Sequence, residues 1–205
     1  MKEFVLRARK AKTDAGINLD QLPKEGKMDS VCASISNALW ISGDVRKDTI
    51  IHVVLEGPTS GPKTISFFGN EIKGLRHDER SIATYIVDAL KRSACLQLNE
   101  ENHVRAGIKI SKKSFERLLW ELSQKHTQAG KKRQVLVLDK DGKDIRGVAL
   151  DKDVVVVFGS PEGLPPKTEN FFKEIKAEKV SIGPNMLFAA HCPIIIHNEL
   201  DRRGL

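Results

Sequence analysis

The fold is decided by two stretches near the end of the chain, VVVVFGSPEGLP at residues 154–165 and SIGPNMLFAAHCPIIIHNELDR at residues 181–202. In each, a β-rich run leads into a glycine loop. The first run is apolar without alternation, the pattern of a strand buried on both faces. A strand that ends in glycine leaves bare backbone where a flat ligand can approach closely. Two such ends in succession predict one ligand held between two loops, at the carboxyl edge of a parallel sheet.

Working outward from these loops, hydrophobic spacing predicts further strands and helices. The expected strands are residues 2–9, 49–55, 64–68, 107–110, 135–138, 154–158 and 179–182. Helices are expected at residues 30–40, at 81–90, from a cap at Ser111 or Ser114 to Lys125, and at 167–175. A last helix is expected to run to Arg202, with Pro193 in its first turn. The sequence DKDGKD after residue 138 predicts a turn. Strand–helix alternation in the second half predicts one α/β domain over residues 1–205.

The strands at 49–55 and 64–68 flank the turn sequence EGPTSGP, so we expect a hairpin there. That hairpin, around residues 50–68, could project from the domain as an extension.

Composition narrows the class of protein. The net charge of +7, from 34 Lys and Arg against 27 Asp and Glu, suits a polyanion such as nucleic acid, although a lysine-rich soluble surface explains it equally well. The three cysteines are far apart, which argues against a disulfide framework and a zinc site. The first ten residues lack a secretory pattern and the apolar runs are too short for a membrane span. We expect a cytoplasmic protein without metal.

Neither glycine loop matches a standard phosphate-binding motif. The loop that holds Gly159 and Gly163 lacks the Gly-Lys-Ser/Thr of a P-loop and the spacing of the dinucleotide fingerprint. Two ordinary strand-to-helix turns remain an alternative. In the second loop, Gly183-Pro184 stiffens a turn after a strand, and residues 186–188 add an apolar wall of the kind that an adenine ring requires. Cys192, just beyond, is expected to be a small buried hydrophobe rather than a nucleophile.

The residues 52–90, HVVLEGPTSGPKTISFFGNEIKGLRHDERSIATYIVDAL, and the stretch 181–202 resemble the archaeal tRNA (pseudouridine-N1)-methyltransferase family, TrmY, of the SPOUT superfamily. The resemblance covers nearly the whole chain and extends to the similar eukaryotic-type ribosomal pseudouridine N1-methyltransferases. It implies an α/β fold of the SPOUT-type knotted methyltransferases, with a mostly parallel sheet, helices on both faces and a C-terminal deep trefoil knot. It also implies a homodimer with each active site near the subunit interface.

The resemblance further implies S-adenosylmethionine as the cofactor, bound in a bent form with its methyl group toward the dimer partner. Carried over residue by residue, the cofactor contacts would be Leu138, Gly159, Gly163, Ser181, Ile182, Gly183, Pro184, Met186, Leu187 and Cys192.

The methyl acceptor in that family is N1 of pseudouridine, a poor nucleophile until its proton leaves. In LRHDERS, Asp78 could accept the proton or hydrogen-bond the uracil edge, Arg80 could stabilise charge on the ring carbonyl or hold a phosphate, and His77 is expected to contact RNA. The alternative is that Asp78 only caps the helix that follows.

Basic residues after the first strand often hold RNA phosphates in knotted methyltransferases, which makes Arg7, Arg9 and Lys10 candidates here. The alternative is a solvated strand end. The histidines at 52, 103, 126, 191 and 197 lack ligand spacing, and we expect structural roles for them.

The function that the resemblance implies is S-adenosylmethionine-dependent methylation of N1 of pseudouridine 54 in the tRNA T-loop. Three alternatives remain: methylation of ribosomal RNA pseudouridine, a non-catalytic dimeric RNA-binding module, and a small-molecule nucleotide enzyme with a basic surface.

Overall fold

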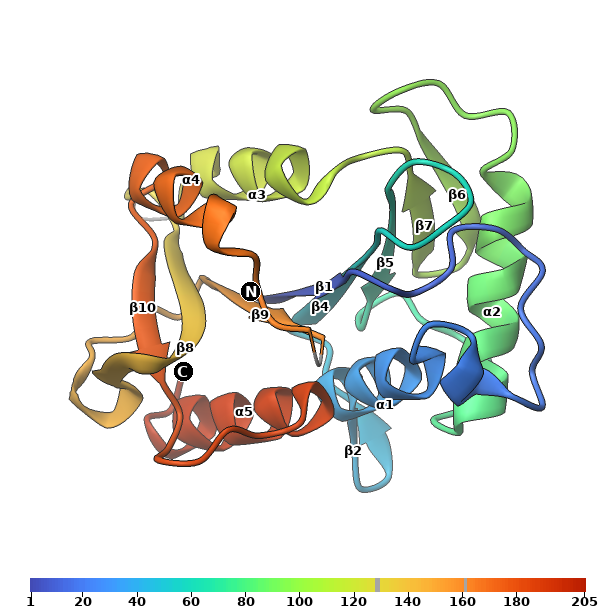
Figure 1. Ribbon diagram of the computed structural model, residues 1–205. Coiled ribbons are helices and arrows are strands. Elements are labelled where there is room, and N and C mark those ends of the chain that lie inside the picture. The colour runs from blue at the N-terminus through green and yellow to red at the C-terminus, as the bar shows by residue number, and fades with distance from the viewer. Residues whose placement is uncertain (128–129, 161) are drawn as a thin grey trace.

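An eight-stranded sheet with strands from both ends of the sequence organises the molecule in a computed structural model that describes residues 1–127, 130–160 and 162–205 (Figure 1). The strand order is β10-β8-β9-β1-β4-β5-β7-β6. Its strands are β1 (Lys2–Ala8), β4 (Thr49–Leu55), β5 (Lys63–Phe68), β6 (Glu101–Arg105), β7 (Ile108–Ser111), β8 (Gln134–Asp144), β9 (Val154–Gly159) and β10 (Glu178–Ser181). A separate small hairpin pairs β2 (Trp40–Ile41) with β3 (Asp44–Val45).

The sheet has a parallel part and an antiparallel part. The neighbours β10, β8, β9, β1 and β4 run parallel, whereas β5, β7 and β6 pair antiparallel. Strand β1 lies between β4 and β9, and all of its residues are buried. The mainly parallel α/β sheet expected from the strand–helix alternation is therefore confirmed.

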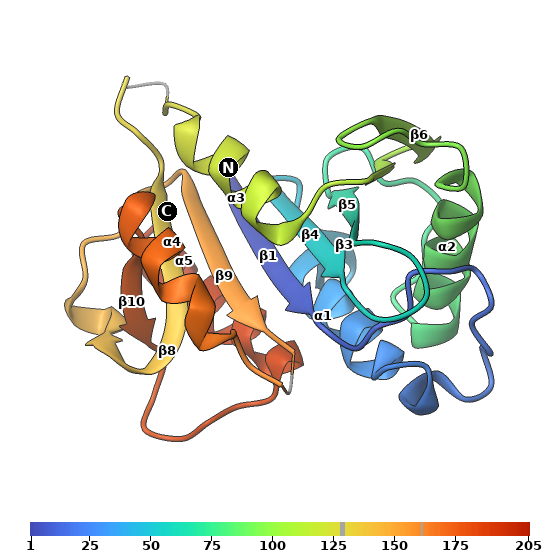
Figure 2. The same ribbon diagram turned by 45° about the horizontal axis from the view of Figure 1, so that its top comes forward.

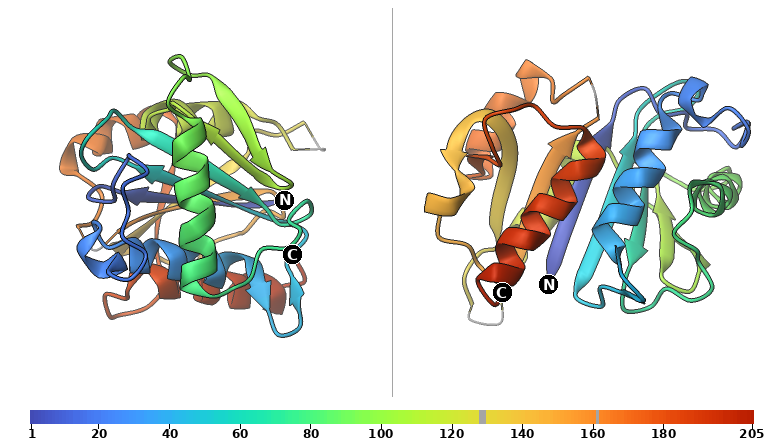
Figure 3. Two further views of the ribbon diagram at one scale, coloured as in Figure 1. Left: turned by 90° about the vertical axis from the view of Figure 1, so that its right-hand side faces the viewer. Right: turned by 90° about the horizontal axis from the view of Figure 1, so that it is seen from below.

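Helices cover both faces of the sheet, as expected (Figures 2 and 3). The described residues form five α-helices: α1 (Met28–Leu39), α2 (Glu79–Arg92), α3 (Phe115–Gln124), α4 (Glu169–Glu174) and α5 (Cys192–Arg202). Phe4 and Leu6 of β1 pack into the core shared with α1, α2 and α5, and Val5, which points the other way, packs with α3 and α4. Of the two candidate caps for α3, Ser114 is the one used, since its Oγ accepts the Arg117 N–H at 3.2 Å.

Two expectations about local structure are wrong, and one strand was missed. The DKDGKD turn is instead part of β8, which continues to Asp144 because β10 pairs with its far end after a register shift. Gly142 permits that crossing, because a Cβ there would stand 2.6 Å from the backbone nitrogen of Val180. The hairpin at 50–68 forms but does not project, since β4 and β5 are interior strands of the sheet. The edge strand β6 was not expected.

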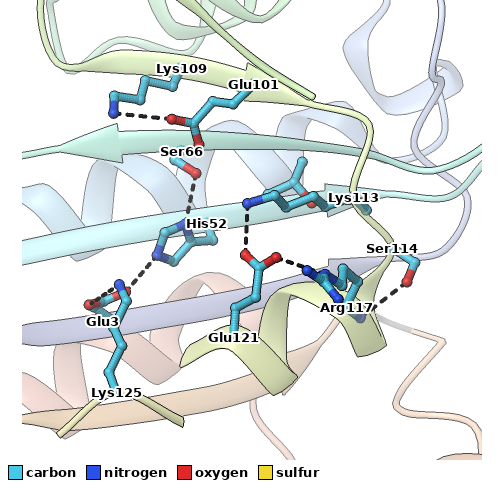
Figure 4. A network of polar contacts seen from close by, with 11 residues as sticks. Glu3, His52, Ser66, Glu101, Lys109, Lys113, Ser114, Arg117, Glu121 and Lys125 are labelled. Carbon is cyan, nitrogen blue, oxygen red and sulfur yellow. Dashed lines mark hydrogen bonds and ion pairs between the residues drawn. The ribbon is translucent and has the colours of Figure 1, made fainter. Parts of the chain in front are cut away.

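A buried polar network lies between the sheet and α3 (Figure 4). The His52 ring joins two strands, with Nε2 2.8 Å from Glu3 Oε2 and Nδ1 2.7 Å from Ser66 Oγ. Burial alone would raise the pKa of the Glu3 carboxyl, but His52, Arg133 and Lys125 hold that pKa well below its usual range. These contacts satisfy polar groups that β1 and β4 bury, which gives His52 the structural role expected of it.

No helix in the described ranges is long and apolar enough to cross a membrane. The same ranges contain no cluster of three or more His, Cys, Asp or Glu side chains suited to a metal ion.

Candidate functional site

A cavity of about 640 Å³ opens where β9 and β10 end, and we call it the glycine-loop cavity. The end of β9 brings Gly159, the end of β10 brings Ser181, and β8 adds Leu138 at the same level. The loop from β10 to α5 forms the remaining wall, from Ile182 to Cys192. The volume is typical of a site for a small organic ligand.

Nine of the ten side chains or backbone positions expected around one ligand line this cavity: Leu138, Gly159, Gly163, Ser181, Ile182, Gly183, Met186, Leu187 and Cys192. Pro184 is not among the lining residues, although its neighbours Gly183 and Asn185 are. The structure thus brings two distant loops and one strand together at a single cavity.

The glycines of these loops are required by the backbone. A Cβ on Gly159 would stand 2.7 Å from the carbonyl carbon of Gly163, and Gly163 itself has a φ of +66°. Gly183 has a φ of +151°, which side-chain-bearing residues rarely adopt. Ser181 fixes the turn, because its Oγ donates to the Gly183 carbonyl at 2.9 Å. Both loops therefore present backbone directly to the cavity.

The wall of the cavity is largely apolar, with Leu138, Phe158, Leu164 and Ile182 among its lining residues. Cys192 is buried, and burial raises the pKa of its thiol to about 11. A thiol held in that protonated state is a packing residue and not a nucleophile. Apolar faces next to exposed backbone groups suit an adenine ring.

Three carboxylates that sequence reasoning missed line the same cavity: Asp139, Glu162 and Glu169. Lys179 binds two of them, with its Nζ 3.0 Å from Asp139 Oδ2 and 2.7 Å from Glu169 Oε1. Glu162 accepts a hydrogen bond of 2.6 Å from Ser160 Oγ. A signal was available for Glu162, since it lies between the two glycines of the first loop.

Residues 77–80, which we call the 77–80 segment, lie outside this cavity. Asp78 caps α2, with its Oδ1 2.8 Å from the backbone nitrogen of Ser81, so the capping alternative is present in the structure. Arg80 is 65 % exposed and pairs with Asp20, with 2.5 Å between Nη1 and Oδ1. His77 is exposed and borders a separate open groove beside Trp40 of β2.

The basic residues after β1 do not behave alike. Arg7 is 4 % exposed, forms ion pairs with Glu56 and Glu116, and stacks over the Phe115 ring, so its predicted contact with RNA is wrong. It points into the face under α3, where an unpaired charge would be costly. Arg9 and Lys10 are exposed, as an RNA contact requires.

The last turn of α1 joins the 77–80 segment to the glycine-loop cavity. Ser36 Oγ donates to the His77 carbonyl at 3.0 Å, and Asn37 Nδ2 donates to the Ala190 carbonyl at 2.8 Å. The next residue, Ala38, accepts a hydrogen bond of 2.9 Å from His197 of α5. The two regions are therefore neighbours on either side of one helical turn.

Known proteins resemble this chain over its full length. A family model for SAM-dependent RNA methyltransferases matches residues 1–205. A tRNA (pseudouridine(54)-N(1))-methyltransferase of Methanococcus aeolicus is 38% identical over 212 residues, with 100% of both chains covered. A protein of the same name from Methanococcus maripaludis is 38% identical over 205 residues, which covers 98% of this chain and 99% of the relative. Among solved structures, Archaeoglobus fulgidus Nep1 bound to S-adenosylhomocysteine has a TM-score of 0.56 at 13% identity, covers 100% of this chain and 99% of its own, and supports the fold alone.

Proposed function

The chain belongs to the family of SAM-dependent RNA methyltransferases, and we propose that it transfers a methyl group from S-adenosylmethionine to N1 of pseudouridine 54 in the T-loop of tRNA. The names of full-length relatives carry the reaction and the substrate. The structural observation that supports it is the glycine-loop cavity, which gathers the predicted cofactor residues at the carboxyl edge of parallel strands.

We assign the cofactor to this cavity. The donor set fits it: Leu138, Ile182 and Leu187 offer apolar contact to the adenine ring, and the loops at Gly159 and Gly183 offer backbone groups to its polar edge. Ser181 and Gly163 keep those loops in shape, and Cys192 fills the floor. We also assign Met186 to the cofactor site, at the mouth of the cavity. Pro184 is proposed to stiffen the turn that follows β10. Bound there, S-adenosylmethionine supplies an electrophilic methyl group.

The other chemical requirement is removal of the proton from the acceptor nitrogen. N1 of pseudouridine must lose its proton as the new N–C bond forms, and a nearby carboxylate can accept that proton. We assign this contact to Asp78, whose Oδ1 caps α2 while Oδ2 lies 3.5 Å from Arg76 Nε at the exposed side. Arg80 is assigned to the ring carbonyl, where negative charge develops, and His77 to the adjoining RNA.

We propose that the active unit is a homodimer. Large apolar side chains are exposed on adjoining elements: Met186 is 79 % and Phe188 72 % exposed in the loop before α5, and Ile194 is 49 % exposed in its first turn. Ile41 of β2, beyond the end of α1, is 45 % exposed. A second copy packed over this face would bury these side chains and enclose the mouth of the cavity.

Arg9 and Lys10 are the proposed contacts for tRNA phosphates, because both are exposed at the end of β1 near the first glycine loop. With a net charge of +7, the protein attracts a polyanion from a distance, and the two side chains would fix its register.

We also propose that the 205 residues form one SPOUT methyltransferase domain with a C-terminal trefoil knot, working in the cytoplasm. Support for one domain comes from the eight-stranded sheet, which joins strands from both ends of the chain, β1 and β10 included. Support for a knot comes from the family resemblance, together with α5, which leaves the sheet edge at β10 and packs back against α1.

The test is methyl transfer from labelled S-adenosylmethionine to two T-loop RNAs, one with pseudouridine at the target and one with uridine, read by nucleoside mass spectrometry. We expect N1-methylpseudouridine from the first RNA only. Product from a ribosomal RNA fragment instead would favour the ribosomal alternative. Absence of product from both kinds of RNA would leave a binding module and contradict the proposed reaction.

A further inference from the structure

The glycine-loop cavity differs in charge from the rest of the protein. The chain as a whole carries a net charge of +7, yet the charged residues among the described lining of this cavity are three carboxylates and one lysine, Lys140. An acidic lining inside a basic protein indicates selection for a cationic ligand.

The three carboxylates are not equivalent. Asp139 and Glu169 share Lys179, whose Nζ lies within 3.0 Å of both, so one half-buried cation offsets one of their two negative charges. The pKa of Lys179 is raised by these two carboxylates, which agrees with a tight ionic contact. One net negative charge remains on this group, and it is shared by two carboxylates that both contact Lys179.

Glu162 keeps its charge inside the cavity. Its side chain is 15 % exposed, and its two strongest contacts are Ser160 Oγ at 2.6 Å and Lys10 Nζ at 3.3 Å. Ser160 is neutral, and Lys10 is 67 % exposed, so water screens that ion pair. Burial would raise the pKa of Glu162, but the Ser160 hydroxyl and Lys10 lower it below its usual value, which keeps the carboxylate ionised at neutral pH.

Methyl transfer changes the charge of the cofactor at one atom. As the S–CH₃ bond breaks and the N–CH₃ bond forms, the electron pair of the broken bond stays on sulfur, and the positive sulfonium becomes a neutral thioether. The proton of the acceptor nitrogen leaves to a base. Substrate and product cofactor therefore differ by one positive charge and one methyl group.

We propose that Glu162 is the residue by which the cavity distinguishes S-adenosylmethionine from S-adenosylhomocysteine, through attraction of its carboxylate to the sulfonium. This inference rests on the proposed function. It makes Glu162 a specificity-determining residue that favours entry of the charged cofactor and exit of the neutral product.

The test is titration calorimetry of the full-length protein with each of the two compounds. For Glu162→Gln, which keeps the shape and the hydrogen bond from Ser160, we expect affinity for S-adenosylmethionine to fall about tenfold and affinity for S-adenosylhomocysteine to fall less than about threefold. Glu169→Gln is the matched control, because it removes the same one unit of negative charge from the same cavity, but at a side chain that Lys179 binds directly. Its ratio of the two affinities should stay within about twofold of the wild-type ratio.

Equal losses for both compounds in Glu162→Gln would mean that Glu162 only supports the loop, and would overturn the proposal. Lys10→Ala gives an independent measurement that does not alter the loop itself. Removal of the competing cation should raise the preference for S-adenosylmethionine, and a lowered or unchanged preference would contradict us. If the wild-type protein binds neither compound, the proposed function fails first and this inference with it.

Discussion

The glycine-loop cavity and the 77–80 segment flank the same turn of α1, but they are built in different ways. The cavity is enclosed by strand ends and by loops whose glycines have no substitute. The 77–80 segment is exposed, and its proposed proton acceptor, Asp78, is also the cap of α2. The glycine-loop cavity is thus a preformed pocket, whereas the 77–80 segment is a set of solvent-accessible groups at the start of α2.

The difference corresponds to the sizes of the two ligands. A small cofactor must be surrounded, so most of the site that we propose for it is built by one chain and only its mouth is left for the second copy to cover. A nucleoside in a large RNA must be approached from outside, so its groups have to remain accessible until the RNA arrives. We therefore expect changes in the cavity to affect cofactor affinity, and changes in the segment to affect turnover.

The largest effect is expected from Gly183→Val. The backbone at Gly183 has a φ of +151°, which valine cannot adopt without strain, so the wall formed by the loop from β10 to α5 would rearrange. Affinity for S-adenosylmethionine, measured by calorimetry, should fall more than about a hundredfold while circular dichroism remains that of a folded protein. Gly43→Val is the control, since Gly43 also has a positive φ and open space but lies in the β2–β3 turn. Normal affinity in Gly183→Val would mean that the cofactor binds elsewhere.

Asp78→Asn should separate the two regions. Asparagine caps a helix about as well as aspartate, so α2 should stay intact while the charge is lost. We expect kcat to fall about a hundredfold with unchanged affinity for the cofactor, as for the loss of a proton acceptor. If turnover in single-turnover assays is unchanged, Asp78 is a helix cap and nothing more.

The stability of the protein should depend on pH through His197, which joins α5 to the last turn of α1. Burial, reinforced by Arg46, lowers the pKa of His197 to about 4, below its usual value near 6.5. The unfolded chain therefore binds the proton first, and the stability that neutral His197 contributes is present above about pH 6.5 and is lost as the pH falls toward 4.

The expected loss is about 2 kcal/mol between pH 7 and pH 5. Denaturant unfolding at the two pH values measures it, and His197→Gln is the comparison because glutamine can still donate to the Ala38 carbonyl without titrating. An equal pH dependence in both proteins would show that another group is responsible.

The smallest effect is expected from Arg9→Ala. Without the guanidinium that we assign to one tRNA phosphate, tRNA binding should weaken about fivefold to tenfold, and the salt dependence of the affinity should fall by about one ion. Arg117→Ala on α3 removes the same charge from a site that is 52 % exposed and should change neither quantity. Filter binding over a range of salt concentrations compares the two variants. Equal effects of both would mean that Arg9 contributes only to the net charge and does not contact a tRNA phosphate.

Patterns of apolar residues predict what is buried, and they predicted the central strands and all five helices well. The apolar run at β9 has no polar alternation, and both faces of that strand are buried. The apolar residues of α3 recur at helical spacing, and one face of that helix is buried. Strand β6 was missed because it is a polar edge strand in which only Val104 is buried. The turn predicted at 139–144 was wrong because the pairing of β10 with β8 is a long-range contact that local composition does not encode.

The position of the cavity was predicted where backbone conformation left a mark in the sequence, and its role as the cofactor site is our proposal. Glycines at strand ends mark the cavity, and nine of the ten residues named from the resemblance line it. Arg7 was predicted to be an RNA contact, and Glu162 was overlooked, for the same reason. Whether a charged side chain in a basic or polar stretch is solvated or buried depends on partners far away in sequence, Glu56 and Glu116 for the first and Lys10 for the second.

The central place of β1 has a consequence for how the protein is made. Lys2 pairs with Thr49 on one side and with Val154 on the other, so the first strand to leave the ribosome needs a partner that is synthesised much later. Until β9 exists, the apolar edge of β1 stays open to other chains. Such non-local pairing makes folding slow and exposes the chain to aggregation, so the cavity that β9 helps to build should be among the last features to form.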